Sequence, residues 1–226
     1  MKTIRTKAIV LRRTNYGEAD RIVQFLTPEH GKVSAIARGV RRERSKLAGG
    51  IELFCRVDST LAVGKGELLI LTGTRIEQVY RQILTEYDRL QFAYDVLKYI
   101  ARAAQTIDEP AFFELCDQAL AALDDVAIDV RIVRAWFWLQ LAILLGVGLN
   151  LETDSNGMKL VGDARYNFDM SEAVFTYHET GRFGSDHIKL LRLLSAQSPK
   201  IAQQVNGIGD LIDDCLWVAE QAQAHE

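Results

Sequence analysis

The sequence has few of the residues that build covalent or metal-bound frameworks. Its three cysteines stand far apart, at positions 55, 116 and 215, and its four histidines are scattered over 226 residues. An odd number of cysteines without a C-x-x-C pair provides neither a disulfide framework nor a zinc site with four ligands. We therefore expect three buried thiols in a reducing compartment, and no bound metal.

Long apolar runs are also missing. The first residues contain no apolar segment long enough for a signal peptide. The most apolar run, residues 135–149, is too short to cross a bilayer and includes Gln140 and two glycines. The sequence thus predicts a cytoplasmic protein without a membrane partner, in which this run forms a buried helix.

Signatures of catalysis and nucleotide binding are absent as well. The GKG triplet at 64–66 lacks the third glycine of a dinucleotide fingerprint, and no G-x-x-x-x-G-K-[ST] loop occurs. The acidic pairs at 124–125 and 213–214 would point about 100° apart on a helix, which is a poor arrangement for two-metal ligation. We therefore predict that the protein is not an enzyme and uses neither a cofactor nor a small-molecule substrate.

What the sequence does have is a strong separation of charge. Residues 1–81 contain 16 Lys and Arg against 8 Asp and Glu, whereas residues 82–226 contain 11 against 22. The net charge is therefore +8 in the first part and −11 in the second, which the overall value of −3 conceals. Such an asymmetry indicates nucleic-acid contact by the basic part.

The basic part has the pattern of a small β-barrel. Short runs rich in β-branched residues alternate with glycine turns, which predicts strands over residues 2–13, 21–27, 32–38, 51–63 and 67–76. Five strands in about 80 residues suit an OB-fold, which binds oligonucleotides across one face and its loops. The alternation alone does not separate an OB-fold from an SH3-like barrel. We expect an OB-fold domain over residues 1–80.

The remainder is predicted to be an α-helical domain, residues 81–226. Apolar residues recur at helical spacing from 82 to 104, through Leu84, Tyr87, Leu90, Tyr94, Leu97 and Ala101. Further helices are expected at 110–123, from Asp129 to about 146, and after Ser185, Ser198 and Gly209. Residues 150–184 have no helical period, but offer an Asn-Gly hairpin turn and a strand. The fold class is therefore α+β, with a barrel followed by a helical bundle that carries a small irregular insertion.

One stretch concentrates the positive charge. Between residues 38 and 46 a single acid, Glu43, faces five cations, which are Arg38, Arg41, Arg42, Arg44 and Lys46. Glycines at 39, 49 and 50 favour a mobile loop, and arginine forks onto phosphate oxygens with two hydrogen bonds. We predict phosphate contacts by these five residues. The alternative is a loop whose charges are neutralised by the acidic half of the same chain.

Other residues of the basic part are expected to support DNA binding. The supporting cations are Arg12, Arg13, Arg21 and Lys32. Tyr16 lies in a polar turn and is the candidate for stacking on a base, whereas Phe25 and Phe54 are expected in the barrel core. Since no segment has the pattern of a recognition helix, sequence-specific base reading is not expected.

These residues resemble the N-terminal region of the RecO family of bacterial recombination mediators. The resemblance covers about 50 residues in order, and its elements are Tyr16-Gly17-Glu18, Asp20-Arg21, Leu26-Thr27, Gly31-Lys32, Ala37-Arg38-Gly39, Arg41-Arg42, Ser45, Leu47 and Gly49. It continues weakly through residues 66–97 and then fades. Many members have two C-x-x-C pairs in a zinc-binding insertion, but residues 150–184 contain no cysteine. We therefore expect no zinc, and packing around Leu160, Tyr166, Phe168, Val174 and Phe175 instead.

The resemblance implies a non-enzymatic function in DNA repair and recombination. Such proteins bind single- and double-stranded DNA, engage the acidic tail of the single-strand-binding protein and associate with RecR. They help to load the recombinase RecA onto coated strands at the nucleoid, and they anneal complementary strands. Backbone-directed arginine and lysine suit an annealing protein, because they hold DNA without reading its sequence.

Three residues of the acidic part are candidates for binding that tail. Arg131 and Arg134 stand three residues apart beside Trp138, a spacing that would form a basic and apolar pocket on one helix face. Core support and pairing within the domain are the alternative. Two other functions also stay open: an RNA-binding OB-fold protein, and a protein–protein adaptor without nucleic-acid affinity.

Overall fold

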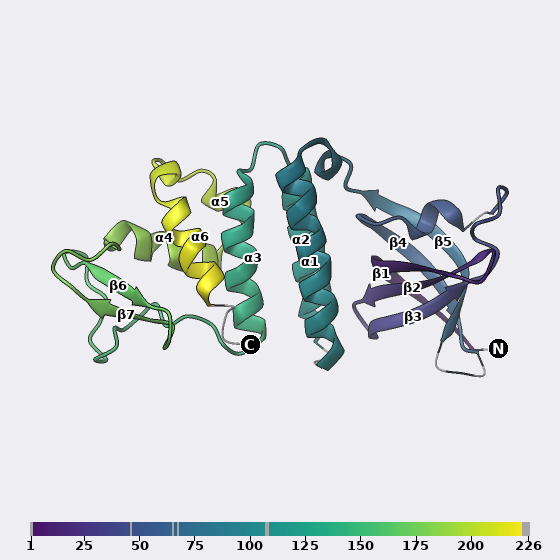
Figure 1. Ribbon diagram of the computed structural model, residues 1–226, viewed down its shortest axis with the longest axis horizontal. Coiled ribbons are helices and arrows are strands. Elements are labelled where there is room, and N and C mark those ends of the chain that lie inside the picture. The colour runs from purple at the N-terminus through teal and green to yellow at the C-terminus, as the bar shows by residue number, and fades with distance from the viewer. Residues whose placement is uncertain (1, 46, 65, 67, 107–108, 223–226) are drawn as a thin grey trace. The chain divides into compact units, whose positions relative to one another are not determined.

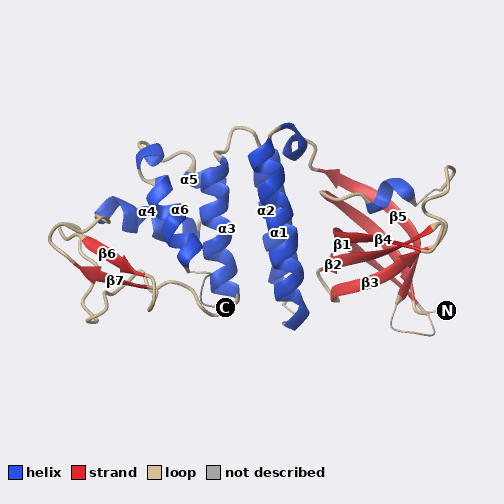
Figure 2. Ribbon diagram, in the orientation of Figure 1, coloured by secondary structure: helices blue, strands red, loops and turns tan. Residues whose placement is uncertain are grey.

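The computed structural model describes residues 2–45, 47–64, 66, 68–106 and 109–222, and its chain divides into two compact units, Met1–Asp124 and Asp125–Glu226. Figure 1 traces the chain from a sheet through a series of helices to a small hairpin and back into helices. Figure 2 shows how the strands gather at the N-terminal end of the first unit and in that hairpin. The predicted α+β class is confirmed.

The first unit contains the barrel and the first two α-helices. Its elements are β1 (Thr3–Tyr16), β2 (Asp20–Thr27), β3 (Gly31–Ala37), the 3₁₀ helix η1 (Ala48–Ile51), β4 (Cys55–Ala62), β5 (Leu69–Val79), the 3₁₀ helix η2 (Gln82–Thr85), α1 (Tyr87–Thr106) and α2 (Ala111–Asp124). The division of the chain near residue 80, made from sequence, stays a prediction about folding domains. In the contacts of the structure, α1 and α2 group with the barrel.

The strand order decides between the two barrel types that the sequence left open. The five strands close in the order β1-β2-β3-β5-β4, and β4 pairs with β1. The pairing of β3 with β5 is parallel, while the other neighbours are antiparallel. A closed five-stranded barrel with this order is an OB-fold.

The long first strand closes the barrel by changing partner. Its first half, from Thr3 to Ile9, pairs with β4, and its second half, from Ile9 to Tyr16, pairs with β2. The register shifts between Val10 and Arg12, where a bulge adds a residue. A bulge bends and twists a strand, which lets β1 curve around the barrel.

Helix α1 covers part of the outer face of the barrel. Inward side chains such as Val10 and Phe25 form the barrel core. Ile9 and Leu26 point to the opposite face by strand alternation, yet they are buried as well. Helix α1 contacts β1 and β3, and the Nζ of Lys32 donates to the carbonyl of Ala101 at 3.0 Å. The helix therefore packs on the face that includes Ile9.

The buried stripe of α1 differs from the one that the sequence suggested. Tyr87 and Tyr94 belong to the apolar series read from the sequence, but they are 76% and 47% exposed. The buried positions include Phe92, Val96 and Ile100, which also recur at helical spacing. Because Tyr and Leu occur on both faces, the apolar pattern identified the helix but not its orientation.

A polar contact joins the barrel to α2. Asp117 on α2 forms an ion pair with Arg56 of β4 and accepts a hydrogen bond from the hydroxyl of Tyr80 at 2.5 Å. Burial, followed by this hydrogen bond, raises the pKa of Tyr80 far above its ordinary value. Phe54, a buried residue with a φ of +58°, adds an edge contact to Tyr94 at 5.1 Å between ring centroids. These contacts keep the helices on the barrel.

The second unit is helical with a short hairpin. Its elements are α3 (Val130–Leu144), β6 (Tyr166–Asp169), β7 (Val174–Tyr177), α4 (Ser185–Ala196), α5 (Pro199–Ala202), the 3₁₀ helix η3 (Ile208–Asp210) and α6 (Ile212–Gln221). Asp129 caps α3 as predicted, because its carboxylate accepts from the backbone N–H of Arg131 at 2.8 Å. Among the described helices, none is long and apolar enough to cross a membrane.

The cysteine-free insertion is held by aromatic side chains. As expected, Tyr166, Phe168 and Phe175 are buried. Two further rings, which were not predicted from the sequence, are those of Phe183 and Trp217, and they stack at 6.1 Å with an interplanar angle of 17°. Phe175 lies 5.7 Å from the Phe183 ring and links the hairpin to that stack. Here an aromatic cluster occupies the core of the insertion.

Candidate nucleic-acid interface

Two loops of the barrel are locked together at one end. The turn between β1 and β2 and the start of the β3–β4 connection meet through Asp20, whose carboxylate accepts from the backbone N–H of Gly39 at 2.7 Å. The backbone N–H of Arg41 donates to the carbonyl of Ala19 at 2.9 Å, and its guanidinium reaches the carbonyl of Gly17 at 3.3 Å. We call residues 16–21 and 38–44 the loop rim.

Glycines allow the sharp turns of the loop rim. Gly17 and Gly39 have φ angles of +56° and +63°, in the left-handed region that residues with a Cβ rarely adopt. Further along the same connection, a Cβ on Gly50 would come within 1.9 Å of the hydroxyl of Thr74 on β5. These glycines thus allow the turns and the close approach through which the segment contacts the barrel, and the mobility of the loop stays a prediction.

The predicted arginines of the loop rim point to solvent without acidic partners. The four that the structure describes are all exposed, namely Arg38, Arg41, Arg42 and Arg44. Within the described part of the chain, no ion pair joins any of them to a carboxylate. Lys46, the fifth predicted cation, lies outside the described residues. The loop therefore presents its positive charge to the surroundings.

Tyr16 and Arg21 belong to the same rim. Tyr16 ends β1 with a side chain that is 55% exposed, and it pairs with Asp20 across the turn. The Nε of Arg21 donates to the side-chain oxygen of Asn15 at 3.0 Å, which orients the guanidinium without neutralising it. An exposed ring beside oriented cations is the combination used to bind single strands.

The other cations that were predicted to support DNA binding, Arg12, Arg13 and Lys32, lie outside the loop rim. Arg13 forms an ion pair of 2.5 Å with Glu52, so its charge already has a partner. Arg12 and Lys32 instead line a hollow between the outer face of the barrel and α1, together with Lys98 and Arg102. The sequence reasoning missed the last two residues, although their spacing of four places them on one side of a helix.

Arg131, Arg134 and Trp138 lie on α3 in the second unit. The guanidinium of Arg131 bonds the carboxylates of Asp129 and Asp213, at 2.6 and 3.0 Å. Arg134 pairs with Glu220 at 2.6 Å, and Trp138 is buried. A pocket for an acidic tail at these residues stays a prediction, and an incoming carboxylate would have to replace those that already bind the two arginines.

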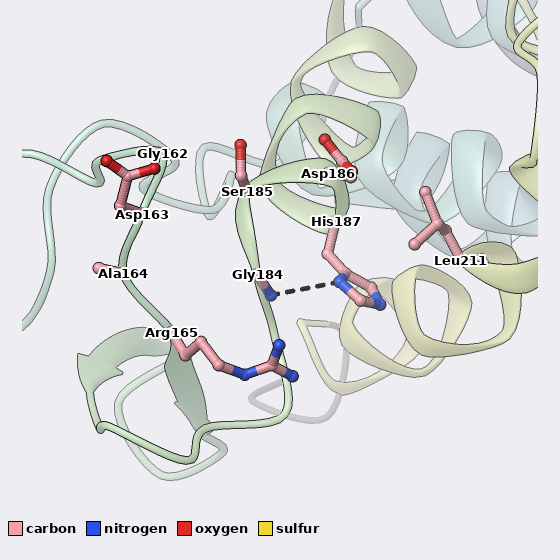
Figure 3. A pocket seen from close by; sticks show the side chains of 9 residues that line it. All are labelled: Gly162, Asp163, Ala164, Arg165, Gly184, Ser185, Asp186, His187 and Leu211. Atoms are coloured by element: carbon pink, nitrogen blue, oxygen red, sulfur yellow. Dashed lines mark hydrogen bonds between the residues drawn. The ribbon is translucent and has the colours of Figure 1, made fainter.

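A separate hollow of about 370 Å³ lies at the start of α4. Figure 3 shows the guanidinium of Arg165 below Gly184, whose backbone N–H donates to the Nδ1 of His187 at 3.3 Å. A helix N-terminus favours anions, but Asp163 and Asp186 also line this hollow and repel them. We assign no ligand to it.

The described residues include no candidate metal site. No cluster of three or more potential metal ligands is present among them. The three thiols are buried, as expected, and burial raises the pKa of each, to about 12 for Cys215. A buried neutral thiol is chemically inert.

The fold and the rim define the class of protein. It is an OB-fold protein with an exposed cationic loop and a helical extension.

Comparison with known proteins identifies the family. Residues 1–80 match the family model of the recombination protein O N-terminal region. Over 164 residues the chain is 31% identical to the DNA repair protein RecO of Dehalococcoides mccartyi, and this match covers 72% of the chain. The matched region spans 64% of that relative, less than two thirds of its length. The chain belongs to the RecO family.

Proposed function

We propose that this chain is a non-enzymatic, DNA-binding mediator of recombination and DNA repair. The observation that carries the proposal is the loop rim, where described arginines stand exposed with no carboxylate partner. Backbone phosphates are the polyanions that such a surface attracts, and they are the same on every DNA sequence. The family relationship and the relative, a DNA repair protein, support the same function.

The proposed activities follow from binding without base reading. A surface that holds phosphates can accept single- and double-stranded DNA, keep complementary strands close for annealing, and present a strand for loading of the recombinase RecA. The natural substrate is then single-stranded DNA coated by single-strand-binding protein, at the nucleoid in the cytoplasm. RecR is the second proposed protein partner, and no surface is assigned to it.

The decisive experiment reverses two charges of the loop rim. Arg41→Glu/Arg42→Glu should weaken binding of a fluorescent oligo-dT by about 100-fold or more, because two phosphate contacts become repulsive. The slope of log affinity against log salt should fall by about 1.4, since each single-strand phosphate contact adds about 0.7. Fluorescence anisotropy at several salt concentrations measures both quantities.

A matched control carries the same change in net charge. Lys159→Glu/Lys200→Glu alters two exposed lysines of the second unit and should bind oligo-dT far more tightly than the Arg41/Arg42 variant, although both lower the net charge by the same four units. An unchanged salt slope in the Arg41/Arg42 variant would remove the loop rim from the binding site. A competition between oligo-dT and the matching oligo-U tests the RNA-binding alternative, which requires a preference for the 2′-hydroxyl. An adaptor would bind neither.

Binding of the acidic tail of single-strand-binding protein is proposed for Arg131, Arg134 and Trp138. A labelled tail peptide should bind the wild type and bind Arg131→Ala/Arg134→Ala at least tenfold more weakly. To bind there, the tail must replace the carboxylates that already pair with both arginines. Undiminished affinity in the double variant would place the tail elsewhere.

A further inference from the structure

The hollow between the barrel and α1 is lined by cations from both elements. It has a volume of about 490 Å³, in the range of pockets that hold a molecule the size of one nucleotide. The lining includes four cations, which are Arg12, Lys32, Lys98 and Arg102. No aspartate or glutamate is among its described lining residues. We call this hollow the helix groove.

The charges of the helix groove are not neutralised within the described residues. Arg12, Lys98 and Arg102 are exposed, and none forms an ion pair with a carboxylate in the part of the chain that the structure describes. Lys32 is fixed by its hydrogen bond to the carbonyl of Ala101, a neutral acceptor that leaves the positive charge in place. Four like charges around one hollow repel each other, and a bound anion removes that cost.

The barrel side of the groove is the face by which OB-folds hold oligonucleotides. Arg12 on β1 pairs with Gln24 on β2, and Lys32 on β3 pairs with Leu26 on β2. Arg12, Gln24 and Lys32 therefore follow one outer face across three neighbouring strands. OB-folds bind strands across the β2–β3 face. Helix α1 covers part of that face in this protein. The helix groove is therefore the part of the face that a strand can still reach.

The helix side of the groove is a regular row. Tyr94, Lys98 and Arg102 follow one another at intervals of four residues, which places them on one side of α1 at steps of about 6 Å. This step is close to the spacing of successive phosphates in an extended strand. Tyr94 is 47% exposed and is held by its edge contact to Phe54, so its ring is positioned in advance.

We propose that the helix groove holds one strand of nucleic acid, with phosphates on Arg12, Lys98 and Arg102 and a base against Tyr94. The proposal rests on the DNA-binding function proposed above and adds a second contact to it. An acidic peptide would use the same cations, but it has no need for an exposed aromatic ring. Gln24 offers an amide donor and acceptor for a base edge, which also favours a nucleotide.

The first test reverses the two cations of the helix. Lys98→Glu/Arg102→Glu should bind a labelled 20-nucleotide oligo-dT about tenfold or more weakly than the wild type. The salt slope should fall by about 1.4, the value for two lost phosphate contacts. Lys159→Glu/Lys200→Glu again serves as the control of equal charge change. Both helix residues are exposed, so the variant should keep the melting temperature of the wild type.

The second test locates the strand. Photo-crosslinking of wild-type protein to an oligonucleotide that carries 5-iodouracil should yield an adduct on the peptide that contains Tyr94. Tyr94→Phe should retain affinity, because the ring persists, whereas Tyr94→Ala should lose about tenfold from the missing stacking contact. The Phe variant also keeps the contact to Phe54, so it controls for loss of packing.

The outcomes separate this inference from the proposed function. If Arg41→Glu/Arg42→Glu loses oligo-dT while Lys98→Glu/Arg102→Glu binds like its control, the groove is no DNA site and the proposed function stands. If the wild type binds no oligonucleotide at low salt, both fail. If oligo-glutamate binds the wild type and only the groove variant loses it, with DNA binding unaffected, the occupant is an acidic protein and the inference is overturned.

Discussion

The arginines of the two units differ in what surrounds them. At the loop rim, Arg41 and Arg42 are exposed, and no described carboxylate pairs with either. In the second unit, Arg131 bonds the carboxylates of Asp129 and Asp213, Arg134 bonds that of Glu220, and Arg182 pairs with Asp214. In the first unit these arginines are thus available for the ligand proposed above, whereas those of the second unit already bind carboxylates. The difference depends on the nearby acids rather than on the arginine.

The cores of the two units differ in a related way. The barrel surrounds mostly aliphatic residues with Phe25 among them, and its strands support one another all the way around. The insertion of the second unit has only two strands of four residues each. An isolated two-stranded sheet is marginal in water, so its stability must come from the side chains that pack on it. Aromatic rings supply large buried areas for that purpose.

The largest expected effect is on this aromatic cluster. Phe175→Ala should lower the free energy of unfolding of the second unit by about 3–5 kcal/mol, because a fully buried ring leaves a cavity. Phe175→Leu should cost less, since it refills part of that space. Urea titration followed by tryptophan fluorescence, to which all three tryptophans of the second unit contribute, measures both changes. A loss below about 1 kcal/mol for the Ala variant would mean that the hairpin is not held by this ring.

The next largest effect concerns the carboxylate that joins the two loops of the rim. Asp20→Ala removes the acceptor of the Gly39 N–H and should cost about 1–2 kcal/mol of stability. Asp20→Asn keeps a side-chain oxygen at that place and should cost less. Chemical denaturation of the three proteins at neutral pH measures the difference.

The same pair of variants separates loop order from charge. Removing a negative charge would by itself strengthen DNA binding in both variants. If the Asp20–Gly39 hydrogen bond positions the arginines, Asp20→Ala should instead bind oligo-dT several-fold more weakly, while Asp20→Asn binds it at least as well as the wild type. Stronger binding by both variants would show that the loop needs no positioning.

Much of the fold was accessible from the sequence because its signals are local. Alternating β-branched residues predicted the five strands, and Asp129 predicted the start of α3 through a hydrogen bond two residues away. The short strand β6 was missed because its four residues, YNFD, include Asn and Asp, which are depleted in strands, and no β-branched residue. The order of the strands, which distinguishes the OB-fold, is a long-range property that alternation does not contain.

The candidate site was accessible in part. The density of arginine between residues 38 and 44 is visible in the sequence, and so is the exposed turn at Tyr16. The contact of Asp20 with Gly39 joins residues 19 positions apart, and the pairing of Arg13 with Glu52 joins residues 39 apart. Lys98 and Arg102 were overlooked because they lie in the half with net negative charge. The net charge of a long segment conceals a short row of cations within it.

A smaller effect on stability comes from the buried thiols, which occur in both units. Burial raises the pKa of Cys116 in the first unit and that of Cys215 in the second, the latter to about 12. In the unfolded chain a thiol titrates near pH 8.5. Stability is therefore full below that pH and declines as the pH rises toward the folded pKa, by about 1 kcal/mol per thiol at pH 9.

Alanine variants assign this loss to each unit. The decrease in unfolding free energy between pH 7 and pH 9 should be smaller by about 1 kcal/mol in Cys215→Ala than in the wild type. Cys116→Ala should show the same reduction for the first unit. Urea titrations at the two pH values measure it. An identical pH dependence in the wild type and both variants would mean that the thiols ionise equally in the folded and unfolded chain.

The smallest effects test the comparison of arginines directly. Arg131→Ala should lower stability by about 0.5–1 kcal/mol, as expected for partly exposed ion pairs, and leave oligo-dT binding unchanged. Arg41→Ala removes one carbonyl contact and should change stability by less than about 0.5 kcal/mol. It should still weaken oligo-dT binding several-fold and reduce the salt slope by about 0.7. Arg131→Ala should therefore show the larger loss of stability, and Arg41→Ala should show the larger loss of DNA affinity. If Arg41→Ala destabilises the protein as much as Arg131→Ala does and binds DNA normally, the loop arginine is structural, and the distinction between the two units is lost.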